Sequence, residues 1–162
     1  EPPKFTFRTY DAKTRFHPNF YRSGKCCVSI LNTWKGEQWT SCQTLSSTLL
    51  TIRSLFDNKP LLNEPGIRED NVDFHNYNKI ITFKNLEIAI LEVIEKKNNN
   101  KYLSQMFEKE IGLLFEKNKD KINNIIENEY AKCSKCLIST SLYKMSVNID
   151  YDNLVKRFIK LK

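Results

Sequence analysis

The chain changes its character near residue 76, and this change limits the possible folds more than any other feature of the sequence. Before residue 76, short segments rich in β-forming residues alternate with turns that contain Pro or Gly. After it, apolar residues recur three or four positions apart over long stretches, which is typical of amphipathic helices. We therefore predict an α+β chain with two parts, residues 1–75 and residues 76–162.

Three elements are predicted in the first part. Residues 4–9 alternate in β-forming side chains and residues 25–31 are rich in apolar and β-branched types, so each segment predicts a strand. Pro2 and Pro3 confine the first strand to a sheet edge or to a strand's beginning. Residues 43–58 carry apolar side chains at helical spacing and predict a helix.

Four helices are predicted in the second part. Their apolar residues place them at about residues 76–97, 102–117, 122–130 and 152–161. No internal repeat is evident.

Composition excludes several classes of protein. A hydrophobic fraction of 40% and an aromatic fraction of 12% are typical of a globular chain. No apolar run approaches the roughly 18 residues that would span a bilayer, so we expect no membrane partner and a location in the cytoplasm or the nucleus. The net charge of +7 favours acidic partners, but no nucleic-acid-binding motif accompanies it, and nucleic acid is not an expected partner.

Cysteine usage points to reduced thiols. The chain has five cysteines, an odd number, and no recognisable secretory signal, so at least one thiol is available for chemistry. Cys133 and Cys136 have the spacing of half a zinc site, but no second pair of ligands is present and His75 is distant in the sequence. We expect no metal site.

Four short motifs occur in order in the first part. Pro2-Pro3 precedes the first predicted strand, and His17-Pro18-Asn19 follows it. Residues 24–31 read Gly-Lys-Cys-Cys-Val-Ser-Ile-Leu, and Trp39 precedes the predicted helix. In this order and at this spacing, the motifs resemble the catalytic half of the ubiquitin-conjugating (UBC) domain, from residue 2 to about residue 66.

Other segments resemble the large Z-type members of that family. Residues 31–36 and the longer loop up to Trp39 depart from the small members in a way that the Z-type shares, as does the segment 63–66 (Asn-Glu-Pro-Gly). Residues 76–78 and 150–151 resemble its C-terminal extension. The resemblance covers nearly the whole chain, more loosely after residue 66.

The resemblance implies the C-terminal part of a UBC-like fold, with an antiparallel sheet remnant and a central helix, followed by a helical extension. The family's domain opens with a helix and two strands ahead of the Pro-Pro motif, and this sequence lacks them. In the family that helix binds the activating enzyme, so we expect this segment alone to be charged with ubiquitin poorly.

By resemblance, Cys27 accepts ubiquitin as a thioester from the activating enzyme and passes it to a substrate lysine or a ligase cysteine. A thioester is reactive enough to be passed on and stable enough to be carried. We expect this thiol in a shallow exposed groove, close to Asn19 and to the loop that carries Glu64. The structural alternative, a buried strand cysteine, is assigned instead to Cys26, because side chains alternate along a strand.

The resemblance also implies roles for residues around Cys27. Asn19 either orders the active-site loop or stabilises the tetrahedral oxyanion, and both roles stay open. His17 and Pro18 brace the loop, and His17 is not expected to act as a general base. Glu64 either orients or deprotonates the incoming lysine, or is a solvated loop acid.

Two more residues belong to the predicted active-site loop. Tyr21 is close enough in sequence to line the cleft, although simple packing is the simpler interpretation. Ser29 lies two positions after Cys27, on the same face of the predicted strand, where it would contribute modestly to gating the cleft.

The implied ligase-binding surface is altered. Phe7 matches the aromatic residue that ligases contact. Thr40-Ser41-Cys42 stands where many relatives have Ser-Pro-Ala, and the loss of that proline removes a rigid apolar contact. We therefore expect Phe7, Ser41 and Cys42 to dock a restricted set of ligases.

The predicted function is that of a ubiquitin-conjugating transferase. Its implied partners are ubiquitin or a ubiquitin-like protein, the activating enzyme, a ligase and a protein substrate. No cofactor is expected on this chain, because the activating enzyme consumes the ATP. The alternatives are a non-catalytic UBC-like ubiquitin-binding or scaffold protein, and a basic helical interaction module.

Overall fold

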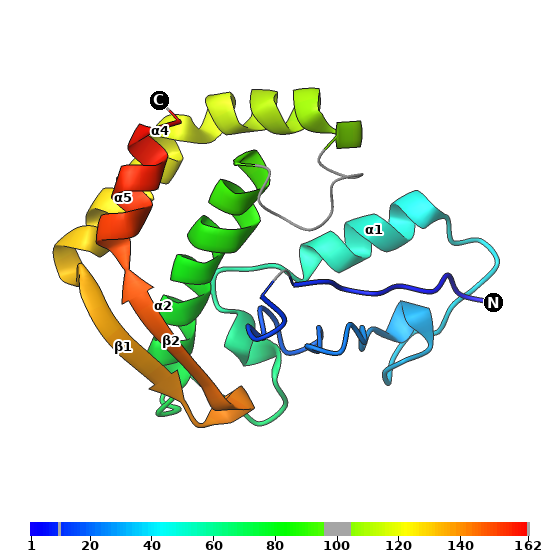
Figure 1. Ribbon diagram of the computed structural model, residues 1–162. Coiled ribbons are helices and arrows are strands. Elements are labelled where there is room, and N and C mark those ends of the chain that lie inside the picture. The colour runs from blue at the N-terminus through cyan, green and yellow to red at the C-terminus, as the bar shows by residue number, and fades with distance from the viewer. Residues whose placement is uncertain (10, 96–104, 162) are drawn as a thin grey trace. The chain divides into compact units, whose positions relative to one another are not determined.

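The structure, a computed structural model, describes residues 1–9, 11–95 and 105–161 (Figure 1). The chain divides into two compact units. Unit 1 comprises Glu1–Asn78 and Ser141–Met145, and unit 2 comprises Lys79–Thr140 and Ser146–Lys162. A short segment from late in the chain thus belongs to the first unit. The predicted division into residues 1–75 and 76–162 does not assign this late segment to the first part, and as a division into domains it stays a prediction.

The described part of unit 1 contains loops, short 3₁₀ turns, helix α1 (Leu45–Ser54) and the first turn of helix α2 (Phe74–Lys84). The helix begins after Thr44 because the side chains of Thr44 and Ser47 each accept a hydrogen bond from the other's main-chain N–H, which satisfies donors that a helix start leaves free. The helix predicted over residues 43–58 is confirmed in its central part. The 3₁₀ turns are η1 (Ser29–Leu31), η2 (Pro60–Asn63) and η4 (Leu142–Lys144).

The core of unit 1 is aromatic and aliphatic. Its buried members are Phe20, Cys26, Val28, Ile30 and Leu31, and Phe5, Phe7, Ile52 and Leu55 pack against them. The Phe20 ring stacks on the Phe7 ring at 4.8 Å and on the Phe56 ring at 5.1 Å between centroids. This packing joins the N-terminal loop to the segment that follows α1.

The strands predicted at residues 4–9 and 25–31 are wrong. Only single antiparallel bridges form there, between Thr6 and Lys25 and between Phe20 and Cys26. The backbone groups bond to loop partners instead. The Val28 amide donates to the Thr33 hydroxyl at 2.9 Å, so the run does not continue as a ladder.

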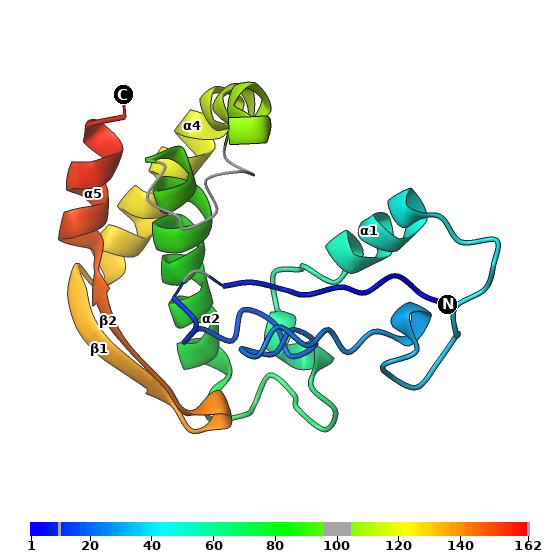
Figure 2. The same cartoon turned by 45° about the vertical axis from the view of Figure 1, so that its right-hand side comes forward.

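The described residues of unit 2 form mainly helices and a hairpin. The later part of α2 (Phe74–Lys84) continues into the π-helical segment η3 (Asn85–Glu92). Helix α4 (Glu108–Lys132) leads to β1 (Lys135–Thr140) and β2 (Met145–Asp150), which pair side by side in both views (Figures 1 and 2).

Helix α5 (Tyr151–Ile159) follows β2 directly. The Asp150 side chain caps it by accepting a hydrogen bond from the Asn153 amide at 3.0 Å. The helix predicted over residues 152–161 is therefore confirmed.

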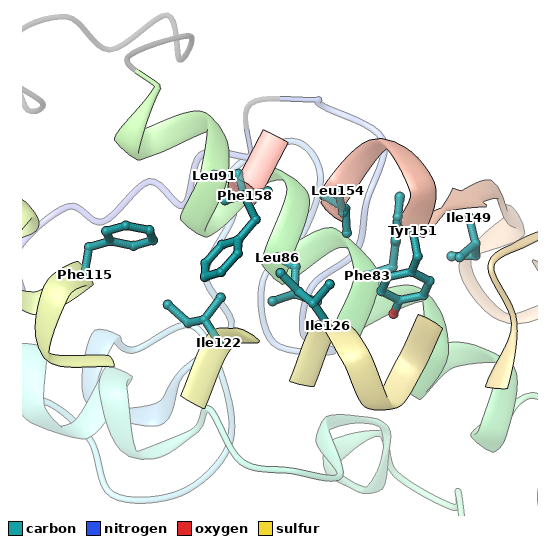
Figure 3. Close-up of a cluster of buried hydrophobic side chains, with 10 residues drawn as sticks. All are labelled: Phe83, Leu86, Leu91, Phe115, Ile122, Ile126, Ile149, Tyr151, Leu154 and Phe158. Atoms are coloured by element: carbon teal, nitrogen blue, oxygen red, sulfur yellow. The ribbon is translucent and has the colours of Figure 1, made fainter. Parts of the chain in front are cut away.

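Figure 3 shows the core of unit 2. Its buried members are Phe83, Leu86, Leu91, Phe115, Ile122, Ile126, Ile149, Tyr151, Leu154 and Phe158. They come from α2, η3, α4, β2 and α5, so each element contributes its apolar face. Arg157 also forms an ion pair with Glu95, at 2.9 Å between Nε and Oε1.

Two predictions for the second part are corrected. The helices predicted at residues 102–117 and 122–130 are one helix from Glu108 to Lys132, because the intervening polar residues 118–121 are compatible with a helix and include no Pro or Gly. The predicted start at residue 102 lies outside the described residues, as does the end at residue 97 of the helix predicted from residue 76.

The α+β class is confirmed, but the paired strands are β1 and β2, which were not predicted. Among the described residues, no helix is long and apolar enough to cross a membrane.

Candidate active site

A small pocket in unit 1 brings together residues from three parts of the chain. Its volume is about 40 Å³, and it is lined by Pro18, Asn19, Tyr21, Cys27, Trp34, Asn63, Glu64 and Pro65. The three predicted catalytic residues, Cys27, Asn19 and Glu64, thus border one space. Trp34, Asn63 and Pro65 were not predicted to line it, although their segments had been noted for their likeness to the Z-type.

Cys27 is held by two hydrogen bonds with Asn19. The Cys27 amide donates to the Asn19 carbonyl at 2.8 Å, and the Asn19 side-chain Nδ2 donates to the Cys27 carbonyl at 2.6 Å. Cys27 is only 4% exposed, so it forms part of the pocket wall and does not lie in the exposed groove that we expected. Cys27 has a free thiol, and the residue borders the same space as Glu64.

Cys26 is as buried as Cys27 but does not line the pocket. It belongs to the buried core cluster of unit 1, and its thiol donates to the Gly24 carbonyl at 3.7 Å. Burial raises the pKa of the Cys26 thiol, which keeps it protonated. Cys26 thus packs in the core and Cys27 borders the pocket, although the predicted strand whose alternation would separate them does not form.

The loop before Cys27 is organised by His17. Its ring Nδ1 accepts a hydrogen bond from the Asn19 amide at 3.1 Å, and its carbonyl accepts one from the Phe20 amide at 3.0 Å. The Arg15 guanidinium donates to the His17 carbonyl at 3.2 Å and to the Pro18 carbonyl. His17 is fully buried and does not line the pocket, which fits a bracing position.

Glu64 follows the turn η2 and meets a residue from the other end of the chain. The Tyr143 hydroxyl donates to Glu64 Oε2 at 2.5 Å, over a separation of 79 residues. Burial and then this hydrogen bond raise the pKa of Tyr143 above its ordinary value, so the hydroxyl keeps its proton and acts as a donor. No feature of the sequence pointed to Tyr143.

Tyr21 borders the pocket and is covered by a cation. The Arg15 guanidinium carbon lies 3.6 Å from the centre of the Tyr21 ring and 4.8 Å from that of the Tyr143 ring. A guanidinium over an aromatic face is favourable, so Arg15 ties the two rings together. Tyr21 thus both lines the pocket and packs against Arg15, and a role in the active-site loop stays a prediction.

Ser29 does not line this pocket. It begins the 3₁₀ turn η1, so the strand alternation that placed it on the same face as Cys27 does not apply. It lies instead beside the next loop: a Cβ added at Gly36 would be 3.0 Å from the Ser29 Cβ.

The residues predicted to bind a ligase lie in different environments. Phe7 is half-buried and stacks on Phe20. Ser41 and Cys42 are exposed in the turn before α1. Their role in ligase binding stays a prediction.

Cys133 and Cys136 lie at the end of α4 and the start of β1. Burial and the neighbouring Cys133 thiol raise the pKa of Cys136. Within the part of the chain that the structure describes, no group of three or more His, Cys, Asp or Glu side chains could hold a metal ion.

Comparison with known proteins relates the first part of the chain to a family. Residues 1–85 match the family model described as ubiquitin-conjugating enzyme. Ubiquitin-conjugating enzyme E2 Z of Xenopus tropicalis is 43% identical over 99 residues, which are 59% of this chain and 32% of that protein. The human E2 Z is 41% identical over 99 residues, which are 59% of this chain and 28% of that protein.

A viral protein is also similar. The ubiquitin-conjugating enzyme E2 of African swine fever virus is 36% identical over 110 residues, which are 65% of this chain and 45% of that protein. The chain thus spans only about a third of the length of the E2 Z relatives that it matches. The resemblance to the family and to its Z-type members is confirmed.

Proposed function

Because this chain belongs to the ubiquitin-conjugating enzyme family, we propose that Cys27 carries ubiquitin, or a ubiquitin-like protein, as a thioester. The observation that carries the proposal is the shared pocket of Cys27, Asn19 and Glu64. A thiol, an amide donor and a carboxylate around one space are the groups that an acyl transfer to an amine needs.

The proposed reaction has two transfers. In the first, the Cys27 sulfur forms a bond to the carbonyl carbon of the modifier, the bond from that carbon to the activating enzyme's sulfur breaks, and the thiol proton passes to the departing sulfur. In the second, a lysine nitrogen bonds to the same carbon and the bond to the Cys27 sulfur breaks. Of the two protons that the lysine ammonium loses, one goes to the Cys27 sulfur and one to solvent.

Asn19 has a double role in this proposal. Its side-chain amide holds the Cys27 carbonyl at 2.6 Å, which supports loop bracing. An amide nitrogen has two N–H groups, so the second is available to the oxyanion that develops beside Cys27. The bracing bond fixes the direction of the second donor.

Glu64 would act on the incoming lysine. A carboxylate on the wall of the pocket attracts an ammonium group. As the nitrogen attacks, it accepts the proton that then passes to solvent. The small volume of about 40 Å³ suits a side chain that enters end-on.

The wider setting follows from the same proposal. The expected partners are an activating enzyme, a ligase that contacts Phe7, Ser41 and Cys42, and a protein substrate. All five cysteines are free, which suits the reducing cytoplasm or nucleus.

The decisive experiment is thioester formation at Cys27. The longest natural polypeptide that carries these residues should be incubated with activating enzyme, ATP and ubiquitin. We expect an adduct that reductant removes, and a reductant-resistant oxyester in Cys27→Ser. Cys26→Ser is the matched control, since it changes the adjacent core thiol, and its adduct should stay reductant-sensitive.

The alternative function is a non-catalytic ubiquitin-binding or scaffold protein. It would bind ubiquitin without forming either adduct. Absence of an adduct with ubiquitin and with ubiquitin-like proteins, in wild type and in Cys27→Ser alike, would overturn the transferase proposal in favour of this one.

A further inference from the structure

The turn between β1 and β2 has a backbone that its sequence does not favour. Tyr143 has φ 60° and ψ 6°, and Lys144 has φ 46°. Positive φ at successive turn positions is usually taken by Asn, Asp or Gly. A conformation that the local sequence disfavours persists only where surrounding contacts hold it, and such positions concentrate at functional sites.

The contacts that hold this turn come from unit 1. The Asp73 carboxylate, which is buried, accepts hydrogen bonds from the Ser141 amide at 3.0 Å and from the Leu142 amide at 2.7 Å. The Arg22 guanidinium donates to the Tyr143 carbonyl at 2.5 Å. The main chain on both sides of the Tyr143 side chain is therefore fixed.

The ring of Tyr143 is fixed as well. The Arg15 guanidinium lies over it, and the Tyr77 ring meets it edge-on at 5.9 Å between centroids. The Tyr77 hydroxyl donates to the Arg15 carbonyl at 2.8 Å, which joins these neighbours to each other. The hydroxyl of Tyr143 thus has one well-defined position, against Glu64 Oε2.

We propose that Tyr143 is a positioning residue for Glu64, holding one carboxylate oxygen so that the other faces the amine that attacks the Cys27 thioester. The inference rests on the proposed function. In the part of the chain that the structure describes, the bond to Glu64 involves Oε2, and no hydrogen bond to Oε1 is found. A glutamate side chain is otherwise free to rotate about three bonds, so a fixed oxygen shortens the search for the reactive geometry.

Discharge of the loaded thioester tests this role. Cys27 is charged with ubiquitin, ATP is then removed, and free lysine is added while the remaining thioester is followed over time. We expect Tyr143→Phe to load normally and to discharge to lysine roughly tenfold more slowly, because hydrogen bonds to charged groups are worth about that factor or more.

A double-mutant cycle separates positioning from general structural damage. Glu64→Ala should also slow discharge, and the double variant Glu64→Ala/Tyr143→Phe should be no slower than Glu64→Ala alone. Tyr130→Phe is the matched control, since it removes a hydroxyl bonded to the Asp152 carboxylate in unit 2, and it should discharge like wild type.

A second variant covers the case in which Tyr143→Phe does not fold. Trifluorotyrosine at position 143 keeps the ring and hydroxyl but ionises at lower pH. Once ionised, it repels Glu64, so the rate of discharge should fall at a lower pH than in wild type.

Each outcome decides between the ideas. Discharge of Tyr143→Phe at the wild-type rate, or an equal further slowing in the Glu64→Ala background, overturns the positioning role and leaves the thioester proposal standing. Failure of the wild type itself to load overturns the thioester proposal, and the positioning role with it.

Discussion

His17 is buried without an opposite charge close enough to offset its burial. Burial lowers its pKa below the ordinary value of 6.5; the carboxylate of Asp57 and the Leu55 carbonyl oppose the shift, and Arg15 adds to it. A lowered pKa means that the unfolded chain takes up a proton at a higher pH than the folded chain. Protonation therefore favours unfolding below about pH 6.5.

We predict that unit 1 becomes less stable as the pH decreases, because His17 takes up a proton more readily in the unfolded chain. The free energy of unfolding should decrease as the pH drops from about 6.5 towards the lowered pKa, and it should be flat in this respect above 6.5. Urea unfolding followed by tryptophan emission between pH 8 and pH 5 measures it. In His17→Gln, the free energy of unfolding should depend less on pH. In His75→Gln, which changes an exposed histidine, the pH dependence should stay as in wild type. A wild-type pH dependence in His17→Gln would refute the assignment to His17.

At the scale of single residues, the sequence predicted site residues whose hydrogen-bond partners are close in the chain. Cys27 and Asn19 lie eight positions apart, and their pairing depends on one local loop. Tyr143 is 79 positions from Glu64, and only the complete fold brings them together. Sequence patterns could not predict this contact, because Glu64 lies in a recognisable segment but Tyr143 belongs to no motif.

At the scale of elements, the sequence predicted helices better than strands. The apolar spacing in α1 and α5 reflects burial of one face, and it located both helices. Residues 4–9 and 25–31 have strand-like side chains, but their backbone groups bond to loop partners such as the Thr33 hydroxyl. Side-chain patterns report burial and do not report which backbone partner is present.

The β1–β2 hairpin was missed for a related reason. Residues 135–140 alternate between exposed and more buried positions, but only Thr140 is fully buried. Six residues with modest hydrophobicity give a weak signal beside a 25-residue helix. The turn residues Tyr143 and Lys144 also lack the Asn-Gly type that marks a hairpin in sequence.

We predict that Asp73 controls the order of the hairpin turn. Its carboxylate accepts from the Ser141 and Leu142 amides, so Asp73→Ala should leave both without that partner. Hydrogen bonds to a charged group are worth about 1.5–3 kcal/mol, which corresponds to roughly 10- to 100-fold faster amide exchange. Hydrogen exchange at Ser141 and Leu142 measures this directly.

The control for this prediction is Asp150→Ala. It removes another carboxylate that accepts from a main-chain amide, that of Asn153 at the start of α5. Exchange at Ser141 and Leu142 should be unchanged in this variant. Protection of those two amides in Asp73→Ala at the wild-type level would show that other contacts hold the turn.

At the scale of the whole molecule, the two units are joined by shared elements of the chain. Helix α2 begins in unit 1 and continues into unit 2, since the division falls between Asn78 and Lys79. The turn Ser141–Met145 belongs to unit 1, while the strand residues that deliver it on either side belong to unit 2. Damage to unit 2 should therefore reach unit 1 through the continuity of the chain.

The chain offers separate optical reports of the two units. Its two tryptophans, Trp34 and Trp39, both lie in unit 1. Far-UV circular dichroism is weighted towards unit 2, because α4 alone contributes 25 helical residues. Emission and dichroism thus follow different parts of the same unfolding reaction.

We predict that Ile126→Ala shifts both signals. Ile126 is 2% exposed in the core of unit 2, so the substitution should cost about 2–5 kcal/mol and lower the denaturant midpoint seen by dichroism. The emission midpoint should move in the same direction by a smaller amount, because unit 1 loses the support for its returning turn but keeps its own core. Leu61→Ala, at a fully buried position of unit 1, should move the emission midpoint more than the dichroism midpoint. An emission midpoint that stays at its wild-type value in Ile126→Ala would mean that unit 1, with its pocket around Cys27, is stable independently of unit 2.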